Sequence, residues 1–304
     1  MNTPTIEIAS NSPSNNKNVD AYAALEKSVL IALQYYSNIH RGSGQKSMVS
    51  SDLYEFARTV VLDYFNLKMR SFTVIFCTPD RFNSVTARLN KSRFKSISSK
   101  EIGLPLGIIA VAVRKRDIPR GAPFQTGGGT PKMVSRTFVI WEDSPGKLEA
   151  GTPAIINIIA MAKALLLVRQ YGDGIFKENK STHIPLNDIL FDDQYGESTG
   201  KPLLRKMRDD LIGRDIKVPV SGDTSAYTYL DNSASTPTFT PIWESVKKAW
   251  KLSEDIWPEV IASVKDTCAN FFGISLDNYD ILFSSNTTEA INIVAKYLNT
   301  GIKN

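Results

Sequence analysis

The segment that most constrains the fold is a hydroxyl-rich turn at residues 285–290 (Ser-Asn-Thr-Thr-Glu-Ala). The apolar run at residues 280–283 predicts a strand before it, and the pattern at residues 288–298 predicts a helix after it. The first N–H groups of a helix lack partners and carry the positive end of its dipole, so such a turn can hold an anion. The alternative is an ordinary capping box, in which Thr287 or Thr288 caps the helix.

The composition, 42% hydrophobic and 22% charged residues, is typical of a globular protein. The net charge of +5 comes without a long basic stripe, so we expect no nucleic-acid partner. Two cysteines, Cys77 and Cys268, and two histidines predict neither a disulfide framework nor a metal site. Because the polar N-terminus lacks a signal-peptide pattern and no apolar run is long enough to span a membrane, we expect a cytoplasmic protein.

The sequence divides into four segments. Residues 1–18, rich in Asn, Ser and Pro, predict a disordered tail. Residues 19–172 form a first domain, and residues 173–226 form a connecting segment with one helical piece near residues 202–212. Residues 227–304 are the start of a second domain.

Hydrophobic periodicity within these segments alternates between helix and strand, which predicts an α/β fold. Asp20 is the expected N-cap of the first helix. Thr152, followed by Pro153, is the expected N-cap of a long apolar helix that ends at Gly172. The expected strands are residues 73–77, 95–99, 107–113, 138–141 and 280–283. The expected helices of the second unit are residues 241–252, 257–272 and 288–298.

A weak internal repeat connects the two units. Phe65, Phe72 and Phe76 recur at a constant offset of 207 residues as Phe272, Tyr279 and Phe283. Each copy has the pattern of an amphipathic helix, a short loop and a strand, which indicates a degenerate duplication.

The second unit resembles a known family. With residues 230–237 (Leu-Asp-Asn-Ser-Ala-Ser-Thr-Pro), the turn at residues 285–290 resembles the opening of aminotransferase class V, the cysteine desulfurase-like group of fold-type I pyridoxal-phosphate (PLP) enzymes. The resemblance implies that Thr287 and Thr288 hold the PLP phosphate and that Asn232 lies near the substrate. It also implies an α/β fold built from incomplete pieces of the PLP-dependent transferase fold.

The first domain carries other motifs similar to that family. Residues 38–42 (Asn-Ile-His-Arg-Gly) resemble its Asn-x-His-Arg-Gly loop, and residues 127–129 (Gly-Gly-Gly) and 148–153 (Leu-Glu-Ala-Gly-Thr-Pro) resemble two further elements. The resemblance therefore covers roughly residues 35–172 and 228–298, and it adds Thr152 and Arg41 to the candidate cofactor-binding residues.

Departures from the family pattern indicate lost catalysis. At the 207-residue offset, Thr287 and Thr288 correspond to Asp80 and Arg81, and a carboxylate repels phosphate. Residues 98–107 resemble the family segment that carries the Schiff-base lysine, but Glu101 stands at that position, and a carboxylate forms no imine. Lys100 is one residue away from it. Asn286 replaces the family's usual glycine before the Thr-Thr pair.

The two units retain complementary parts, and class V enzymes are dimers in which the Ala-Gly-Thr loop of one subunit reaches the phosphate of the other. We therefore expect a homodimer or an intramolecular pseudo-dimer in which the first unit presents Thr152 to Thr287 and Thr288.

The resemblance implies part of a PLP-dependent enzyme acting on an amino acid, and the catalytic lysine is expected beyond Asn304. This chain is expected to be catalytically incomplete, with no catalytic residue assigned. Two alternatives stay open: a pseudoenzyme module for dimerisation or regulation, and a small anion- or nucleotide-binding protein that uses residues 285–288 without PLP.

Overall fold

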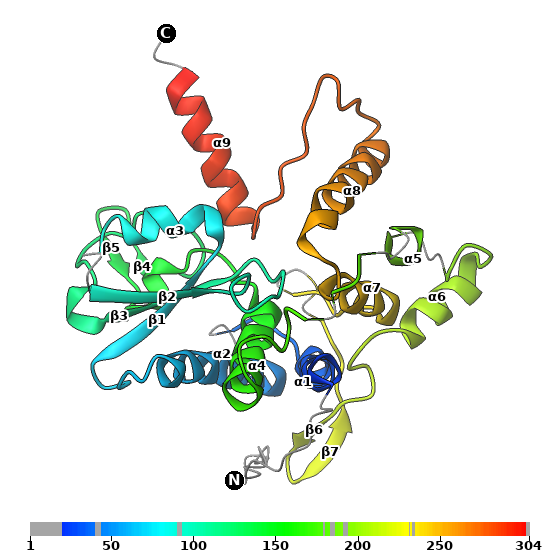
Figure 1. The fold of residues 1–304 in the computed structure, drawn as a ribbon, viewed down its shortest axis with the longest axis horizontal. Coiled ribbons are helices and arrows are strands. Elements are labelled where there is room, and N and C mark those ends of the chain that lie inside the picture. Colours follow the sequence, from blue (N-terminus) through cyan, green and yellow to red (C-terminus); the bar gives the residue numbers. More distant parts are fainter. Residues whose placement is uncertain are drawn as a thin grey trace.

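A computed structural model describes residues 20–39, 44–89, 93–178, 180–182, 186–190, 194–230, 232 and 235–301 (Figure 1). The α-helices are α1 Ala21–Gln34, α2 Gln45–Tyr64, α3 Pro79–Thr86, α4 Ile155–Tyr171, α5 Leu186–Leu190, α6 Gly200–Asp209, α7 Thr240–Trp250, α8 Trp257–Phe272 and α9 Thr287–Gly301. The strands are β1 Phe72–Cys77, β2 Phe94–Ser98, β3 Ile109–Arg114, β4 Pro131–Val134, β5 Val139–Trp141, β6 Lys217–Val220 and β7 Asp223–Ala226. Short 3₁₀ turns lie at Lys115–Asp117, Gly146–Leu148 and Glu254–Ile256. The mixed helices and sheets confirm the α/β class.

A three-stranded antiparallel sheet in the order β1-β3-β2 forms the centre of the first domain. Because side chains of a strand alternate between faces, the sheet has two apolar faces. One face packs on α1, α2 and α4 and includes Val74, Phe76, Ile97, Ala110 and Ala112. The other packs on α3 and includes Ile75, Cys77, Val111 and Val113, with Val85 and Leu89 opposite. Figure 1 shows the sheet between α3 on one side and α2 and α4 on the other.

Local capping explains where the helices of the first domain begin and end. The Asp20 carboxylate accepts a hydrogen bond from Ala23 N at 3.1 Å, which confirms the predicted N-cap of α1. Gly172, with φ of 104°, ends α4 as predicted. The predicted cap at Thr152 is wrong, because α4 begins at Ile155 with Ala154 at the N-cap. The Thr152 carbonyl instead accepts a hydrogen bond from another part of the chain.

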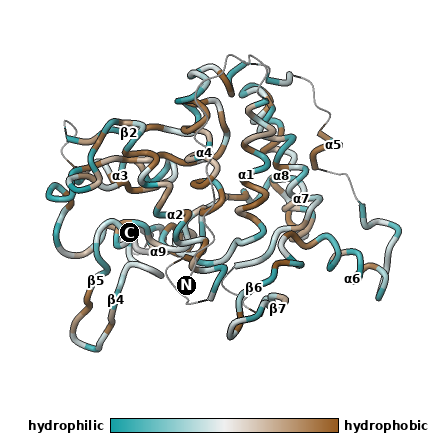
Figure 2. The backbone as a smooth tube through the Cα atoms, turned by 90° about the horizontal axis from the view of Figure 1, so that it is seen from below, coloured by the Kyte–Doolittle hydropathy of each residue, from teal (hydrophilic) through white to brown (hydrophobic). Residues whose placement is uncertain are grey.

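The connecting segment contains more structure than its sequence predicted. Besides α6, it forms α5 and the β6–β7 hairpin, which Figure 2 shows at the periphery of the molecule. Phe176 is fully buried, and its carbonyl accepts a hydrogen bond from the Tyr22 hydroxyl at 3.1 Å. Trp243 and Trp250 of α7 join the same core as α1 and α4. The first domain, the connecting segment and α7 of the second unit therefore share one core.

The predicted strand at residues 280–283 is wrong, because these residues form no regular structure. Leu282 is 72% exposed, and in the part of the chain that the structure describes no strand lies beside it. A strand needs a neighbour for its backbone hydrogen bonds, and here none is supplied. The helix–loop–strand pattern therefore forms only in the first copy, at α2 and β1. Figure 1 shows α9 projecting away from the rest of the chain.

Among the described residues, no helix is both long enough and apolar enough to span a bilayer.

Candidate functional site

The first turn of α9 rests on two loops of the first domain. The side-chain amide of Asn286 donates hydrogen bonds to the carbonyls of Ala150 and Thr152, at 3.3 and 3.1 Å. One turn further along α9, the Asn292 amide donates to the Thr126 carbonyl at 3.2 Å. The turn at residues 285–290 and the loop that carries Thr152 are therefore in contact.

Glycines make this close approach possible. A Cβ at Gly151 would lie 2.3 Å from Asn286 Oδ1, and φ at this glycine is +82°. A Cβ at Gly127 would lie 2.2 Å from Thr288 Cγ2. Any larger residue at either position would overlap the start of α9, so these two loop glycines have a packing role.

Asn286, and not Thr287 or Thr288, caps α9. Asn286 Oδ1 accepts a hydrogen bond from Glu289 N at 3.0 Å, while Glu289 Oε2 accepts from Ser285 N at 2.7 Å and from the Ser285 hydroxyl. Glu289 is the third residue of the helix, as in a capping box, but its carboxylate accepts from the N–H of Ser285, one residue before the cap Asn286. Capping and docking on the first domain thus depend on one side chain.

These residues fit a phosphate group only in part. The N–H groups of Thr287 and Thr288 belong to the first helical turn, where intrahelical partners are lacking, and the Thr287 side chain is exposed. However, Glu289 already accepts from both donors of Ser285 and places negative charge beside the turn. A phosphate that used Ser285 would have to displace this carboxylate.

A cleft of about 500 Å³ lies beside this contact and joins three of the sequence motifs. Its lining includes Asn38 and Ile39, next to Gly129 and Gly151. The acidic residues that line it are Glu55, Glu142, Asp143 and Glu149. Arg58 also lines the cleft, and no lysine of the described residues does. The described lining of the cleft therefore provides neither an imine-forming amine nor a positive field for a phosphate.

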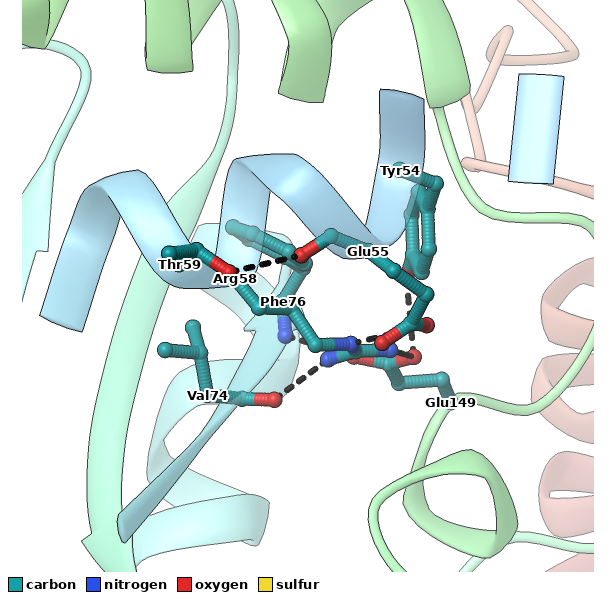
Figure 3. Close-up of polar contacts among 7 residues, drawn as sticks. All are labelled: Tyr54, Glu55, Arg58, Thr59, Val74, Phe76 and Glu149. Atoms are coloured by element: carbon teal, nitrogen blue, oxygen red, sulfur yellow. Dashed lines mark hydrogen bonds and ion pairs between the residues drawn. The ribbon is translucent and has the colours of Figure 1, made fainter. Parts of the chain in front are cut away.

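A buried ion pair between Arg58 of α2 and Glu149 anchors the loop that carries Thr152 (Figure 3). Arg58 Nη1 donates to Glu149 Oε1 at 2.9 Å, and Nη2 donates to Oε2 at 2.6 Å. The Tyr54 hydroxyl donates to Oε2 and Phe76 N to Oε1, both at 2.8 Å. Arg58 Nη1 also donates to the Val74 carbonyl. Both carboxylate oxygens of Glu149 are thus doubly hydrogen-bonded, as a buried charge requires.

This pair also completes the free edge of the sheet. Val74 and Phe76 lie on β1, whose other edge pairs with β3. Arg58 donates a hydrogen bond to the Val74 carbonyl, and Glu149 accepts one from Phe76 N, as the backbone of a neighbouring strand would. The ion pair therefore takes the place of a strand at this edge of the sheet.

Burial, together with the Glu149 charge, raises the pKa of the Tyr54 hydroxyl well above its ordinary value. The Glu149 charge and its hydrogen bonds outweigh burial at Arg58 and raise the pKa of its guanidinium.

The sequence interpretation missed Tyr54 and Arg58. The signal was available, because Arg58 falls between Ala57 and Val61 on the apolar stripe of α2, where an unpaired charge is costly.

Both residues near the Schiff-base position of the family have polar partners in the structure. Glu101 Oε1 accepts a hydrogen bond from Ser98 N at 2.8 Å. Lys100 Nζ forms an ion pair with Glu254 at 2.8 Å, and its side chain is 75% exposed. Lys100 is thus directed toward the 3₁₀ turn before α8 and not toward the start of α9.

The two remaining candidates are less informative. Arg41 lies outside the described residues, as does the predicted tail at residues 1–18. Asn232 lies in an exposed turn, where its carbonyl accepts a hydrogen bond from the Thr236 hydroxyl at 3.3 Å. The structure records no hydrogen bond between Asn232 and the Thr287–Thr288 pair among the residues it describes.

Comparison with known proteins finds the family over part of the chain. Residues 94–187 match the family model described as Aminotransferase class-V. The chain is 33% identical over 85 residues to a probable cysteine desulfurase of Staphylococcus aureus strain Mu50, covering 28% of this chain and 21% of the relative. A probable cysteine desulfurase of Halobacterium salinarum is 33% identical over 79 residues, covering 26% and 19%.

One solved structure, the apo cysteine desulfurase of Thermococcus onnurineus NA1, aligns with a TM-score of 0.39 and 16% identity over 49% of this chain and 65% of that chain. This likeness is too low to carry an argument about the site.

The matches support a resemblance to class V aminotransferases of the cysteine desulfurase-like group. The family model covers the motifs at residues 127–129 and 148–153, and the motifs at residues 230–237 and 285–290 lie outside it. The chain spans about a fifth of the length of the curated relatives it matches.

Proposed function

We propose that this chain forms part of a PLP-dependent class V enzyme that acts on an amino acid, and that it supplies the phosphate-binding side of the site without forming the imine. The observation that carries the proposal is the contact of Asn286 with Ala150 and Thr152. This contact supports the proposal because, in the family, the two residues after the position of Asn286 hold the phosphate and the loop corresponding to Thr152 comes from a second subunit. The arrangement supports an intramolecular pseudo-dimer.

In such a site, the first N–H groups of α9 and the hydroxyls of Thr287 and Thr288 would hold the phosphate. Gly127 and Gly151 let the two loops approach the helix closely enough to enclose that group. When bound, PLP supplies the electron sink for chemistry at an amino acid. The residues of this chain would bind and orient the cofactor, while an amine from elsewhere would form the covalent link.

Two observations support the non-catalytic part of the proposal. Glu101 stands where the family has its lysine, and Lys100 forms an exposed ion pair with Glu254. The cleft beside Gly151 is lined by four acidic residues and no lysine among those described. The same acidity favours a second candidate, a module that regulates or dimerises with a complete enzyme and binds no cofactor.

Calorimetric titration with pyridoxamine 5′-phosphate, which cannot form an imine with surface lysines, tests the proposal. We expect binding that is lost with pyridoxamine, which lacks the phosphate, and weakened about tenfold by Thr288→Val, since each charge-assisted hydrogen bond contributes roughly 1.5–3 kcal/mol. Thr224→Val, in the exposed hairpin strand β7, is the matched control and should bind normally.

Three other outcomes are informative. Absence of phosphate-dependent binding would favour the regulatory module. Equal affinity for inorganic phosphate would favour a simple anion-binding protein. A single lysine labelled in stoichiometric amount by PLP and borohydride would show that the chain forms the imine itself.

A further inference from the structure

We propose that one end of the central sheet, where β1 and β2 begin and β3 ends, binds double-helical nucleic acid through its phosphate backbone. Because β3 runs antiparallel to both neighbours, its last residue lies beside the first residues of the other two strands, with Arg114 opposite Phe72. This pairing brings together three basic segments that are separate in the sequence, at residues 68–70, 93–95 and 114–116.

Hydrogen bonds and ion pairs join these segments. Lys115 N donates to the Ser71 carbonyl at 3.0 Å, which connects the end of β3 with the loop before β1. Arg93 Nη1 lies 3.3 Å from Asp117 Oδ1, and Arg116 Nε lies 3.9 Å from the same oxygen, which connects the start of β2 with the end of β3. We call the exposed cations of these segments the basic edge: Lys68, Arg70, Arg93, Arg114, Lys115 and Arg116.

Little negative charge opposes the basic edge. Asp117 is the only acidic residue within residues 65–72, 93–97 and 109–120, and its side chain is 10% exposed. Asp63, in the last turn of α2, is the next carboxylate along the chain. The cations of the basic edge without an ion pair among the described residues are Lys68, Arg70, Arg114 and Lys115. The excess of positive charge favours a ligand that carries many negative charges.

The geometry of the basic edge fits a row of phosphates. Four of its six cations are arginines, whose planar guanidinium donates paired hydrogen bonds to phosphate oxygens. Neighbouring strands lie about 4.8 Å apart, so the three strand ends spread the cations over roughly 10 Å. A duplex carries one charge per about 1.7 Å of its axis, so several cations can contact phosphates at once and release counterions. A single phosphate group would contact only part of this surface.

The aromatic rings at this end of the sheet favour a duplex over a single strand. The Arg114 guanidinium carbon lies 5.4 Å from the centre of the Phe72 ring, and Lys95 Nζ lies 5.7 Å from that of Phe65. Both rings are partly buried against the core and already have a cation over one face. Single-strand binding uses rings that stack on unpaired bases. We therefore expect contacts with the backbone and no preference for base sequence.

Strand pairing also explains why the sequence predicted no nucleic-acid partner. That expectation rested on the absence of a long basic run, whereas the basic edge is assembled from segments up to 48 residues apart (116 minus 68). Figure 1 shows the start of β1 and the end of β3 at the outer end of the sheet, with α6 on the opposite side of the molecule. A basic patch on α6 therefore provides an internal control.

Fluorescence anisotropy of the full chain with a short labelled DNA duplex of mixed sequence tests the proposal. A plot of the logarithm of the binding constant against the logarithm of the salt concentration should have a slope of about −4 to −5, because each phosphate contact contributes about −0.9. The triple variant Arg70→Gln/Lys115→Gln/Arg116→Gln should reduce the magnitude of this slope by about 3.

The matched control is Lys201→Gln/Arg205→Gln/Arg208→Gln in α6, which removes the same charge from exposed positions and should keep the slope. Both variants should unfold at the temperature of the unchanged chain. Binding of a DNA or an RNA duplex supports the proposal, and the tighter of the two identifies the ligand.

Four outcomes would overturn the proposal: no binding at low salt, an equal loss of slope in the α6 variant, tighter binding of a single strand, or tighter binding of polyglutamate. The last would favour an acidic protein as the partner. None of these measurements depends on the cofactor site at α9.

Discussion

The Asn286 side chain donates a hydrogen bond of 3.1 Å to the carbonyl of Thr152, a residue 134 positions earlier in the chain. The same side chain caps α9 through its Oδ1 atom. A single residue therefore sets both the start of the helix and its position on the first domain. Because one side chain does both, a single substitution at Asn286 can test the contact.

Asn286→Ala should loosen α9. It removes a helix cap and two hydrogen bonds to loop carbonyls, for which we expect a local loss of about 1–2 kcal/mol. Hydrogen exchange of the α9 amides measures the effect. Asn278→Ala, at an exposed loop position, is the matched control and should leave exchange unchanged. Equal protection of α9 in both variants would contradict the docking role.

Gly151→Ala should lower the free energy of unfolding by more than its backbone strain alone would. Its Cβ would meet Asn286 at 2.3 Å, whereas Gly222, also at positive φ, has open space around it. Both substitutions share a strain of about 1–2 kcal/mol. We expect Gly151→Ala to lower the free energy of unfolding by roughly 1 kcal/mol more than Gly222→Ala, as overpacking does. Chemical denaturation measures both. The excess should vanish when Asn286→Ala is added.

Breaking the Arg58–Glu149 pair should be strongly destabilising. Glu149→Gln leaves the buried guanidinium uncompensated, which typically costs about 3–5 kcal/mol. The exposed pair Lys100–Glu254 is the control, and Lys100→Met should change stability by less than about 1 kcal/mol.

In guanidinium unfolding, the double variant Arg58→Met/Glu149→Leu should lower the free energy of unfolding by less than the sum of the losses in the two single variants. Additive costs would show that the two side chains act independently.

Stability should fall with pH in the alkaline range because of Cys77. Burial raises the pKa of its thiol from 9.0 to about 12 in the folded protein. Between these values the unfolded chain loses the proton while the folded chain keeps it, so the free energy of unfolding falls by up to about 1.4 kcal/mol per pH unit. Cys77→Ala should flatten this slope. Cys268→Ala retains Cys77 and should keep it, and identical slopes in the two variants would refute the assignment.

Local chemistry made much of the fold predictable. Asp20 and Gly172 act within one turn of the helices they limit, so their roles depend on neighbours in sequence. The strands of the central sheet were also found, because β-branched and apolar runs mark a buried sheet wherever it lies. The failures involve groups whose partners are distant. The run at residues 280–283 has strand-like composition but no strand to pair with.

The candidate site shows the same division. The motifs predicted that the loop that carries Thr152 lies beside the turn before α9, and the hydrogen bonds of Asn286 join these two segments. They did not identify Asn286 as the contact residue, nor Arg58 as the partner of Glu149. Both assignments depend on directional hydrogen bonds between segments separated by 91 to 136 residues.

The sequence alone thus determined the resemblance to class V aminotransferases, the α/β class and the absence of a lysine at the Glu101 position. Only the tertiary structure decided that the start of α9 lies on Gly127 and Gly151, and that Glu289 covers the donors of Ser285. The physical reason is the distance along the chain over which each kind of interaction acts. Propensity and capping act over a few residues, whereas excluded volume and buried hydrogen bonds depend on which distant backbones meet.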